Sequence, residues 1–187
     1  MNHYLYKNFI VEVLNEPTYE LGSTNKDFNY EKIFFSDDGQ EYYPTSKHGI
    51  KIYRDNQVIT GSLLIGSGGA TGVYQNSSLI DDNELLICCC DTVFCIALPT
   101  LDLKWKTKAD WATCFRIFKQ DNDYIVHGET QISKLDKGGN IKWEFGGADI
   151  FVSLDNEEVF TIENDGISLI DFSKTKYKIN FEGKQLL

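Results

Sequence analysis

The chain has 187 residues, of which 42% are hydrophobic and 13% aromatic, and its formal net charge is −10. This composition excludes an intrinsically disordered chain and fits a single domain with a sizeable core. The negative charge disfavours binding to nucleic-acid phosphates or to anionic membranes. It favours a basic protein partner, although solubility alone would explain it equally well.

The first sixty residues are expected to form short strands around one long loop. Alternation of apolar and polar residues predicts a strand at 9–14, and the polar stretch 16–31 reads as the loop. Asp37-Asp38-Gly39 is a hairpin-turn sequence, after which a return strand would begin. The predicted strands in this part are 9–14, 32–36, 41–43 and 50–53.

Residues 66–72, with the sequence Gly-Ser-Gly-Gly-Ala-Thr-Gly, are the richest in glycine. Backbone amides of consecutive glycines could cradle an anion. However, the stretch lacks the Lys-Ser/Thr pair of a P-loop, and no helix clearly follows it. We therefore interpret it as a crossing between sheets, where only glycine allows close backbone approach.

Three units of about forty residues follow one another between residues 79 and 181, and each is predicted to be an antiparallel meander. Trp105 and Trp143 recur near the ends of the first two units, where a large apolar side chain is suited to packing between neighbouring sheets. Ile179 takes the place of the tryptophan in the third, which we expect to be an atypical terminal cap. Asp-Asn pairs at 82–83, 121–122 and 155–156 predict hairpin tips. The predicted strands are 85–90, 93–98, 124–127, 130–135, 141–145, 159–162 and 167–170.

These patterns predict an all-β fold of stacked antiparallel four-stranded meanders, like a small or incomplete β-propeller. The two units that end in tryptophan, at 95–105 and 132–143, resemble quinoprotein-type (PQQ-like) β-propeller repeats, and this resemblance implies blade geometry. One domain, 1–187, is expected. Its parts are N-terminal strands with a long loop (1–60), a Gly-rich connection (61–78) and three blade-like repeats (79–181).

The five cysteines are Cys88, Cys89, Cys90, Cys95 and Cys114. Their odd number and the adjacent triplet argue against a disulfide framework. Zinc requires four converging ligands, whereas consecutive residues of a strand point to opposite faces, so Cys89 would face away from Cys88 and Cys90. We interpret the cysteines as small buried hydrophobic residues and expect no metal and no cofactor.

The best catalytic candidate is His127-Gly128-Glu129. A histidine oriented by Glu129, with Asp149 contributed from the end of a unit, would suit a hydrolase. No nucleophile is marked nearby, and a hydrogen-bonded structural histidine explains the same sequence. Both interpretations remain open at this point.

A partner-binding surface is predicted at the acidic hairpin tips and at Trp111. Trp111 does not recur in register, so it is the aromatic residue that we expect to be exposed as an interface anchor. Equivalent turns of stacked units should lie along one rim, which would attract a basic partner. The predicted rim residues are Asp82, Glu84, Asp121, Asp123, Asp155 and Glu157.

The stretches 127–129 and 146–151 also resemble small bacterial immunity proteins, and this resemblance implies occlusion of a toxin. The leading expectation is therefore a non-enzymatic, cytoplasmic protein-binding module whose partner is a basic toxin domain. The N-terminus lacks the apolar segment of a signal peptide, and no apolar run reaches transmembrane length, which supports the cytoplasm. The alternatives are a hydrolase that uses His127, Glu129 and Asp149, and a scaffold that completes a propeller with another chain.

Overall fold

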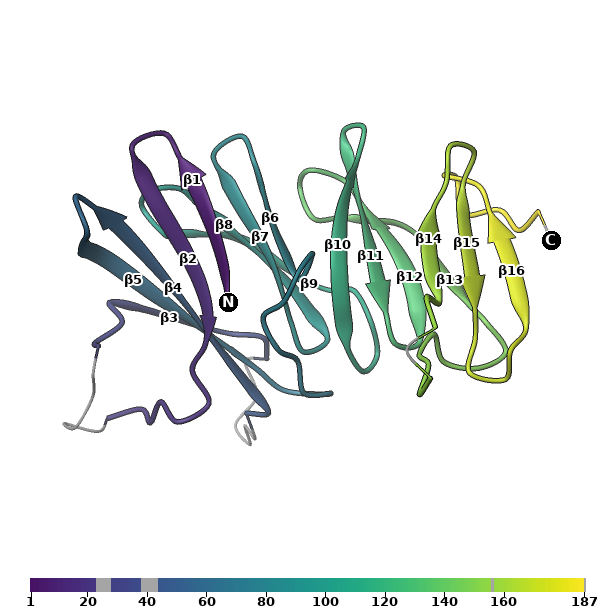
Figure 1. Cartoon of the computed structure of the whole chain (residues 1–187), viewed down its shortest axis with the longest axis horizontal. Helices are drawn as coiled ribbons and strands as arrows, with labels where there is room; N and C mark the ends of the chain where they lie inside the picture. Colours follow the sequence, from purple (N-terminus) through teal and green to yellow (C-terminus); the bar gives the residue numbers. More distant parts are fainter. Residues whose placement is uncertain (23–27, 38–43, 156, 187) are drawn as a thin grey trace.

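A computed structural model describes residues 1–22, 28–37, 44–155 and 157–186 and contains sixteen β-strands, with no helix in those ranges. The strands form four sheets, which stand side by side in chain order along the long axis of the molecule (Figure 1). The predicted all-β, propeller-like fold of stacked antiparallel meanders is confirmed. No helix in the described ranges is long and apolar enough to span a membrane.

The first sheet has five strands in the order β1-β2-β4-β5-β3. The strands predicted at 9–14, 32–36 and 50–53 are confirmed, whereas neither β1 nor β5 was predicted as a strand. The expected return strand 41–43 lies outside the described residues, and β3 pairs in parallel with β5. The bounds are β1 Asn2–Tyr6, β2 Phe9–Asn15, β3 Lys32–Phe35, β4 Ser46–Arg54 and β5 Gln57–Gly66.

The second, third and fourth sheets are antiparallel meanders in which each strand pairs with the next one along the chain. All seven strands predicted in this region are confirmed, each within one residue at either end. The second sheet holds β6 Ser78–Asp81, β7 Glu84–Cys89, β8 Thr92–Ala97 and β9 Leu103–Lys108. The third holds β10 Cys114–Gln120, β11 Asp123–Gly128, β12 Gln131–Leu135 and β13 Ile141–Gly146. The fourth holds β14 Phe160–Ile162, β15 Ile167–Ile170 and β16 Lys176–Ile179.

The two tryptophans of the repeat pack between neighbouring sheets, as their register predicted. Trp105 on β9 donates its indole N–H to the carbonyl of Lys137 at 3.1 Å, in the turn that joins β12 to β13. Trp143 on β13 donates to the carbonyl of Phe181 at 3.0 Å, in the turn that follows β16. Each large apolar ring thereby covers a turn of the next sheet, and its polar N–H keeps a partner.

These contacts align the fourth sheet differently from the prediction. Since Trp105 meets the turn after β12 and Trp143 meets the turn after β16, strand β16 corresponds to β12. Ile179 therefore corresponds to Leu135 and not to a tryptophan. The turn 163–166 between β14 and β15 occupies the position of 121–122. The Asp-Asn pair at 155–156 is a local turn signal, and such a signal does not specify which turn of the unit it forms.

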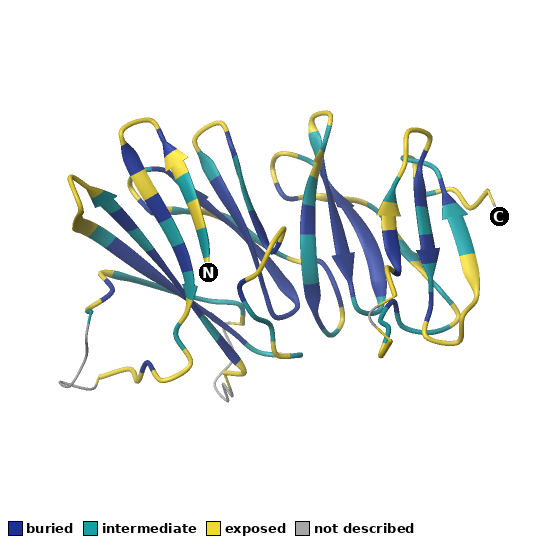
Figure 2. Cartoon of the chain, in the orientation of Figure 1, coloured by how far each residue is buried: buried dark blue, intermediate teal, exposed yellow. Residues whose placement is uncertain are grey.

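Three apolar cores fill the spaces between neighbouring sheets. Figure 2 shows buried residues along the strands and exposed residues gathered at the turns. A fourth cluster covers the outer face of the first sheet, where Tyr19 and Tyr30 of the long loop pack on Leu63 and Ile65. Side chains alternate along β5, so Leu64 faces the second sheet instead.

The Gly-rich stretch packs closely against the second and third sheets. A Cβ atom on Gly66 would lie 2.6 Å from the sulfur of Cys90, and one on Gly69 would lie 1.8 Å from the hydroxyl of Thr113. At Gly66 and Gly69, therefore, the crossing between the sheets leaves no room for a side chain, as expected for a close backbone approach.

Candidate functional site

The turns of the stacked sheets form two opposite rims (Figure 1). We call one the hairpin rim; it carries the turns β6–β7, β10–β11 and β14–β15. We call the other the Trp111 rim; it carries the turns β7–β8, β11–β12 and β15–β16, together with the loop 109–113. Two of the predicted acidic residues, Asp155 and Glu157, precede β14 and lie at the Trp111 rim, where both pair with Lys174. The prediction that all six acids share one rim is therefore wrong.

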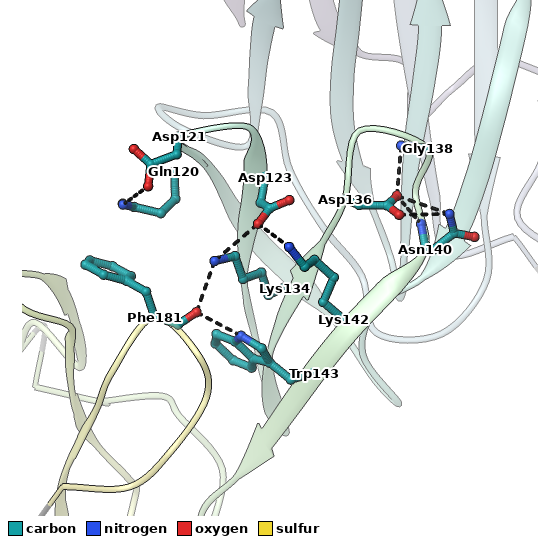
Figure 3. Close-up of polar contacts among 10 residues, drawn as sticks. All are labelled: Gln120, Asp121, Asp123, Lys134, Asp136, Gly138, Asn140, Lys142, Trp143 and Phe181. Atoms are coloured by element: carbon teal, nitrogen blue, oxygen red, sulfur yellow. Dashed lines mark hydrogen bonds and ion pairs between the residues drawn. The ribbon is translucent and has the colours of Figure 1, made fainter.

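The acids at the hairpin rim are largely neutralised by lysines. Glu84 pairs with Lys104 on β9. Asp123 binds Lys142 at 2.8 Å and Lys134 at 3.3 Å (Figure 3). These pairs relieve most of the repulsion that crowded carboxylates would otherwise create.

The two remaining acids of this rim, Asp82 and Asp121, lie at the exposed tips. Asp82 is 3.6 Å from the amine of Lys137. Asp121 accepts a hydrogen bond from the Gln120 amide at 3.3 Å and forms no ion pair within the described part of the chain. The hairpin rim is therefore a surface of paired charges and not a continuous acidic patch.

Sequence reasoning missed a buried carboxylate, Asp81, which joins the second sheet to the third. It accepts hydrogen bonds from Lys119 on β10 and from the hydroxyl of Tyr124 on β11, and it lies 3.4 Å from the amine of Lys137. Burial would raise the pKa of Asp81, but the hydrogen bonds from Lys119 and Tyr124 outweigh it and hold the pKa below its usual range. Asp81 and Asp82 are adjacent in the sequence. Asp81 has a structural role because its side chain points inward from β6, whereas Asp82 lies at the exposed turn.

His127 is buried and fully hydrogen-bonded. The Nε–H of Arg116 donates to its Nδ1 at 3.2 Å, so its Nε2–H donates to the carbonyl of Phe151 at 3.2 Å. Its ring stacks on Phe160 with the centroids 4.7 Å apart. Burial, with the positive charge of Arg116, lowers the pKa of His127 to about 3. The imidazole is therefore neutral near pH 7, and neither of its nitrogens is available to a substrate.

The three residues of the hydrolase alternative do not meet. Among the described residues, no hydrogen bond joins His127 to Glu129 or to Asp149. Asp149 instead accepts the Ile150 N–H at 2.8 Å and the Ser173 hydroxyl at 2.6 Å. The bond from Ser173 holds the turn β15–β16 to the segment that follows β13, which is a structural role.

Trp111 is the most exposed aromatic side chain at the Trp111 rim, with 75% of its surface accessible, and its predicted exposure is confirmed. The neighbouring Asp110 is buried and accepts five hydrogen bonds. Its Oδ1 receives the N–H groups of Ala112 (2.7 Å) and Thr113 (2.9 Å). Its Oδ2 receives the N–H and the hydroxyl of Thr130 and the N–H of Gln131, at 2.9–3.0 Å.

The Trp111 loop is also held from its other side. Gly69 N–H donates to the carbonyl of Ala112 at 2.9 Å. The amine of Lys108 lies 5.6 Å from the centroid of the Trp111 ring and is paired with Asp91 at 2.9 Å. Trp111 therefore projects from a loop whose backbone is fixed on both sides.

All five cysteines are free and buried, so their interpretation as small core residues is confirmed. One detail of the prediction is wrong. Cys90 packs on the same side as Cys89, and Cys88 packs on the opposite side. Cys90 has a φ of 55° in the turn that follows β7, so the alternation of the strand ends before it. In the described part of the chain, no three His, Cys, Asp or Glu side chains come together to hold a metal ion.

No protein-family model and no curated protein matches this sequence. Among solved structures, the chain is similar to the computationally designed Ika8 protein (TM-score 0.52, 12% identity, 99% of this chain and 59% of that chain). It is also similar to the computationally designed Ika4 protein (TM-score 0.51, 13% identity, 78% of this chain and 96% of that chain). The WD40 β-propeller domain of Doa1 gives a TM-score of 0.41 at 13% identity over 72% of this chain and 41% of that chain.

At these identities the similarities concern the fold alone. The chain spans 59% of the length of the designed Ika8 protein. The chain is thus an all-β protein of stacked, propeller-like antiparallel sheets.

Proposed function

We propose that this chain is a non-enzymatic protein-binding module whose partner docks on the Trp111 rim. The observation that carries the proposal is a tryptophan with 75% of its surface exposed, on a loop that the buried Asp110 holds in place. Tryptophan is enriched among the residues that supply most of the binding energy of interfaces. A fixed loop also lowers the entropic cost of association, because little ordering remains to be done on binding.

The immunity function that the sequence resemblance implies fits this location. The two stretches that carry the resemblance, 127–129 and 146–151, lie beside the Trp111 loop. The N–H of Glu129 donates to the carbonyl of Thr113 at 2.8 Å, and the N–H of Phe151 donates to the carbonyl of Glu129 at 2.7 Å. We propose that these stretches form one surface with Trp111, which occludes a bacterial toxin in the cytoplasm.

The partner is proposed to be basic. The chain carries a net charge of −10, and Glu129, Asp155 and Glu157 lie at the Trp111 rim. Electrostatic attraction of this kind acts mainly on the association rate and weakens with salt. We therefore expect association to slow between low and physiological ionic strength.

The test is capture of the partner from the host with the tagged chain, followed by binding measurements on the purified pair. Trp111→Ala should weaken binding by about thirtyfold or more, the effect expected of an anchor residue. The matched control is Leu5→Ala, which removes a similarly exposed apolar side chain (83%, against 75% for Trp111) from the first sheet and should leave the affinity unchanged. A partner that binds the Trp111→Ala protein as tightly as the unaltered chain would refute the proposal.

A further inference from the structure

We infer that the Trp111 rim receives one face of an amphipathic α-helix of the partner protein, with a basic residue of that helix beside Glu129. The inference rests on the proposed protein-binding function and names the kind of partner that fits the same surface. The observation that carries it is a second exposed aromatic residue at this rim, Phe172, which is held in the same way as Trp111.

Phe172 repeats the relationship between Trp111 and Asp110. Each exposed aromatic residue directly follows a buried aspartate, because Asp110 and Asp171 are both 1% exposed. The exposed fraction of Phe172 is 42%, against 75% for Trp111. Asp171 accepts the N–H of Thr175 within the turn β15–β16 at 2.8 Å. Buried carboxylates therefore fix two separate turns of the rim, and an aromatic ring projects from each of them.

A row of backbone hydrogen bonds crosses the rim between these two turns. The N–H of Glu129 donates to the carbonyl of Thr113 at 2.8 Å. The N–H of Phe151 donates to the carbonyl of Glu129 at 2.7 Å, and the N–H of Phe172 donates to the carbonyl of Ile150 at 2.7 Å. Backbone segments joined in this way lie about 5 Å apart, so the steps from Thr113 to Phe172 span roughly 15 Å.

Apolar side chains are exposed along this row. Ile150 lies in the row between the two aromatic residues and is partly exposed, whereas the neighbouring Phe151 is buried between the third and fourth sheets. Leu154 belongs to the same segment and has 82% of its surface exposed. The rim thus presents a line of apolar groups on a backbone that its own hydrogen bonds hold in place.

The row favours a helix over an extended segment as the occupant. Its N–H and carbonyl groups bond to one another, so they are not available to an added strand. An α-helix satisfies its own backbone groups and needs only side-chain contacts. Residues eleven positions apart lie on the same face of a helix with a separation of about 16 Å. A helix of about three turns therefore reaches from the Trp111 loop to Phe172.

The charges of the rim select a helix with a basic edge. Glu129 lies in the middle of the row and forms no ion pair among the described residues. Beside Leu154, Asp155 and Glu157 share the amine of Lys174, at 3.8 Å and 2.8 Å. A lysine or arginine that flanks the centre of the apolar helix face would pair with Glu129, whereas an acidic residue there would be repelled.

The probe for the test is a blocked helical peptide of alanine, leucine and lysine. Its leucines occupy positions i, i+4, i+7 and i+11, and its lysines flank this apolar face. It should bind the intact chain saturably and shift the indole N–H NMR signal of Trp111. The signals of Trp105 and Trp143 should not shift, because their indole N–H groups are bonded to the carbonyls of Lys137 and Phe181.

Two control peptides test whether the helix itself is recognised. One has the same composition in scrambled order, and the other has a proline in place of a central alanine. Both should bind at least about tenfold more weakly, since neither forms the amphipathic helix.

Variants of the chain test the two contacts that the inference adds to Trp111. Phe172→Ala should weaken peptide binding about tenfold. The matched control is Ile141→Ala, which removes an apolar side chain of similar exposure (41%) at the start of β13 and should leave peptide binding unchanged. Glu129→Gln should weaken binding about threefold, whereas Asp121→Asn at the hairpin rim should not change it.

Absence of saturable binding, or binding that tolerates the central proline, would overturn the inference. Equal effects of Phe172→Ala and Ile141→Ala would also overturn it. The proposed function is tested separately, by the binding of the captured partner to the Trp111→Ala protein. A captured partner that requires Trp111, together with a negative peptide result, would refute the helix while the proposed function is retained.

Discussion

Trp143 and Gly183 meet across the boundary between the third and fourth sheets, and a Cβ atom on Gly183 would lie 2.6 Å from the Cδ2 atom of the indole. Trp105 and Gly139 repeat this relationship one sheet earlier, at 2.5 Å. Both glycines also have φ near +80°, a conformation that other residues rarely adopt. The same contact therefore recurs at two boundaries between sheets: a tryptophan of one sheet packs against a glycine in a turn of the next sheet.

Substitution of Gly139 or Gly183, the glycines of these contacts, should destabilise the protein. Gly139→Ala and Gly183→Ala are each expected to lower the free energy of unfolding by about 2–3 kcal/mol, since the new methyl group must displace an indole ring. Gly22→Ala is the matched control, because Gly22 has a φ of 77° with no atom within 4 Å of a Cβ. It should cost about 1 kcal/mol, from the backbone conformation alone. If urea denaturation shows the same loss in free energy of unfolding for all three variants, the indole contact does not have this role.

Charge reversal at two neighbouring acids of the hairpin rim should have unequal effects. Asp121→Lys changes an exposed residue without an ion pair in the described structure, so stability should change by less than about 0.5 kcal/mol. Asp123→Lys would place a third amine beside Lys134 and Lys142 and should cost about 2 kcal/mol or more. Thermal unfolding of both variants tests this, and similar melting temperatures would show that the Asp123 pairs contribute little.

Stability should fall as the pH drops from 6.5 toward 4. Burial lowers the pKa of His127 to about 3 and that of His48 to about 4. An unfolded histidine takes up its proton near pH 6.5, so below that pH the unfolded state binds more protons and gains stability. Each histidine should therefore cost about 2 kcal/mol between pH 6.5 and 5.

Urea unfolding at pH 7 and pH 5 measures this loss. His127→Phe keeps an aromatic ring against Phe160 but cannot be protonated, so it should show about half of the pH dependence of the unaltered chain. A stability that does not change between these pH values would mean that the two histidines are not held neutral in the folded state.

Thiol titration should separate the folded from the denatured chain. In denaturant all five cysteines should react, because all are free. In the folded protein reaction should be slow, since all five are buried. Cys90 should react first, because hydrogen bonds from Cys89, Thr45 and Ser46 lower the pKa of its thiol to about 6, against the effect of burial. Fewer than five thiols in the denatured chain, prepared without oxidation, would indicate a disulfide.

The secondary structure was predictable because its signals are local. Alternation of apolar and polar residues predicts strands, and Asp-Asn or glycine turns separate these strands. Both signals act within a few residues of the chain and do not depend on which other strands pack nearby. The exposure of Trp111 followed from a similar comparison, because it alone among the tryptophans has no counterpart in the repeat. Trp105 and Trp143, in contrast, recur at equivalent positions of the repeat, and their packing between sheets was predicted correctly from that recurrence.

Only the tertiary structure shows which turns of the repeats are equivalent and which charged side chains form ion pairs. The Asp-Asn pair at 155–156 looked like the earlier hairpin tips, but contact with Trp143 assigns that position to the turn 163–166. Asp123 resembles a free surface acid in sequence, but two lysines brought from other strands neutralise it. His127 was the best catalytic candidate in the sequence, but in the folded structure Arg116 and the carbonyl of Phe151 are hydrogen-bonded to its two ring nitrogens. The sequence determines the strands because their signals lie between chain neighbours, whereas ion pairs, hydrogen bonds and burial depend on residues that only folding brings together.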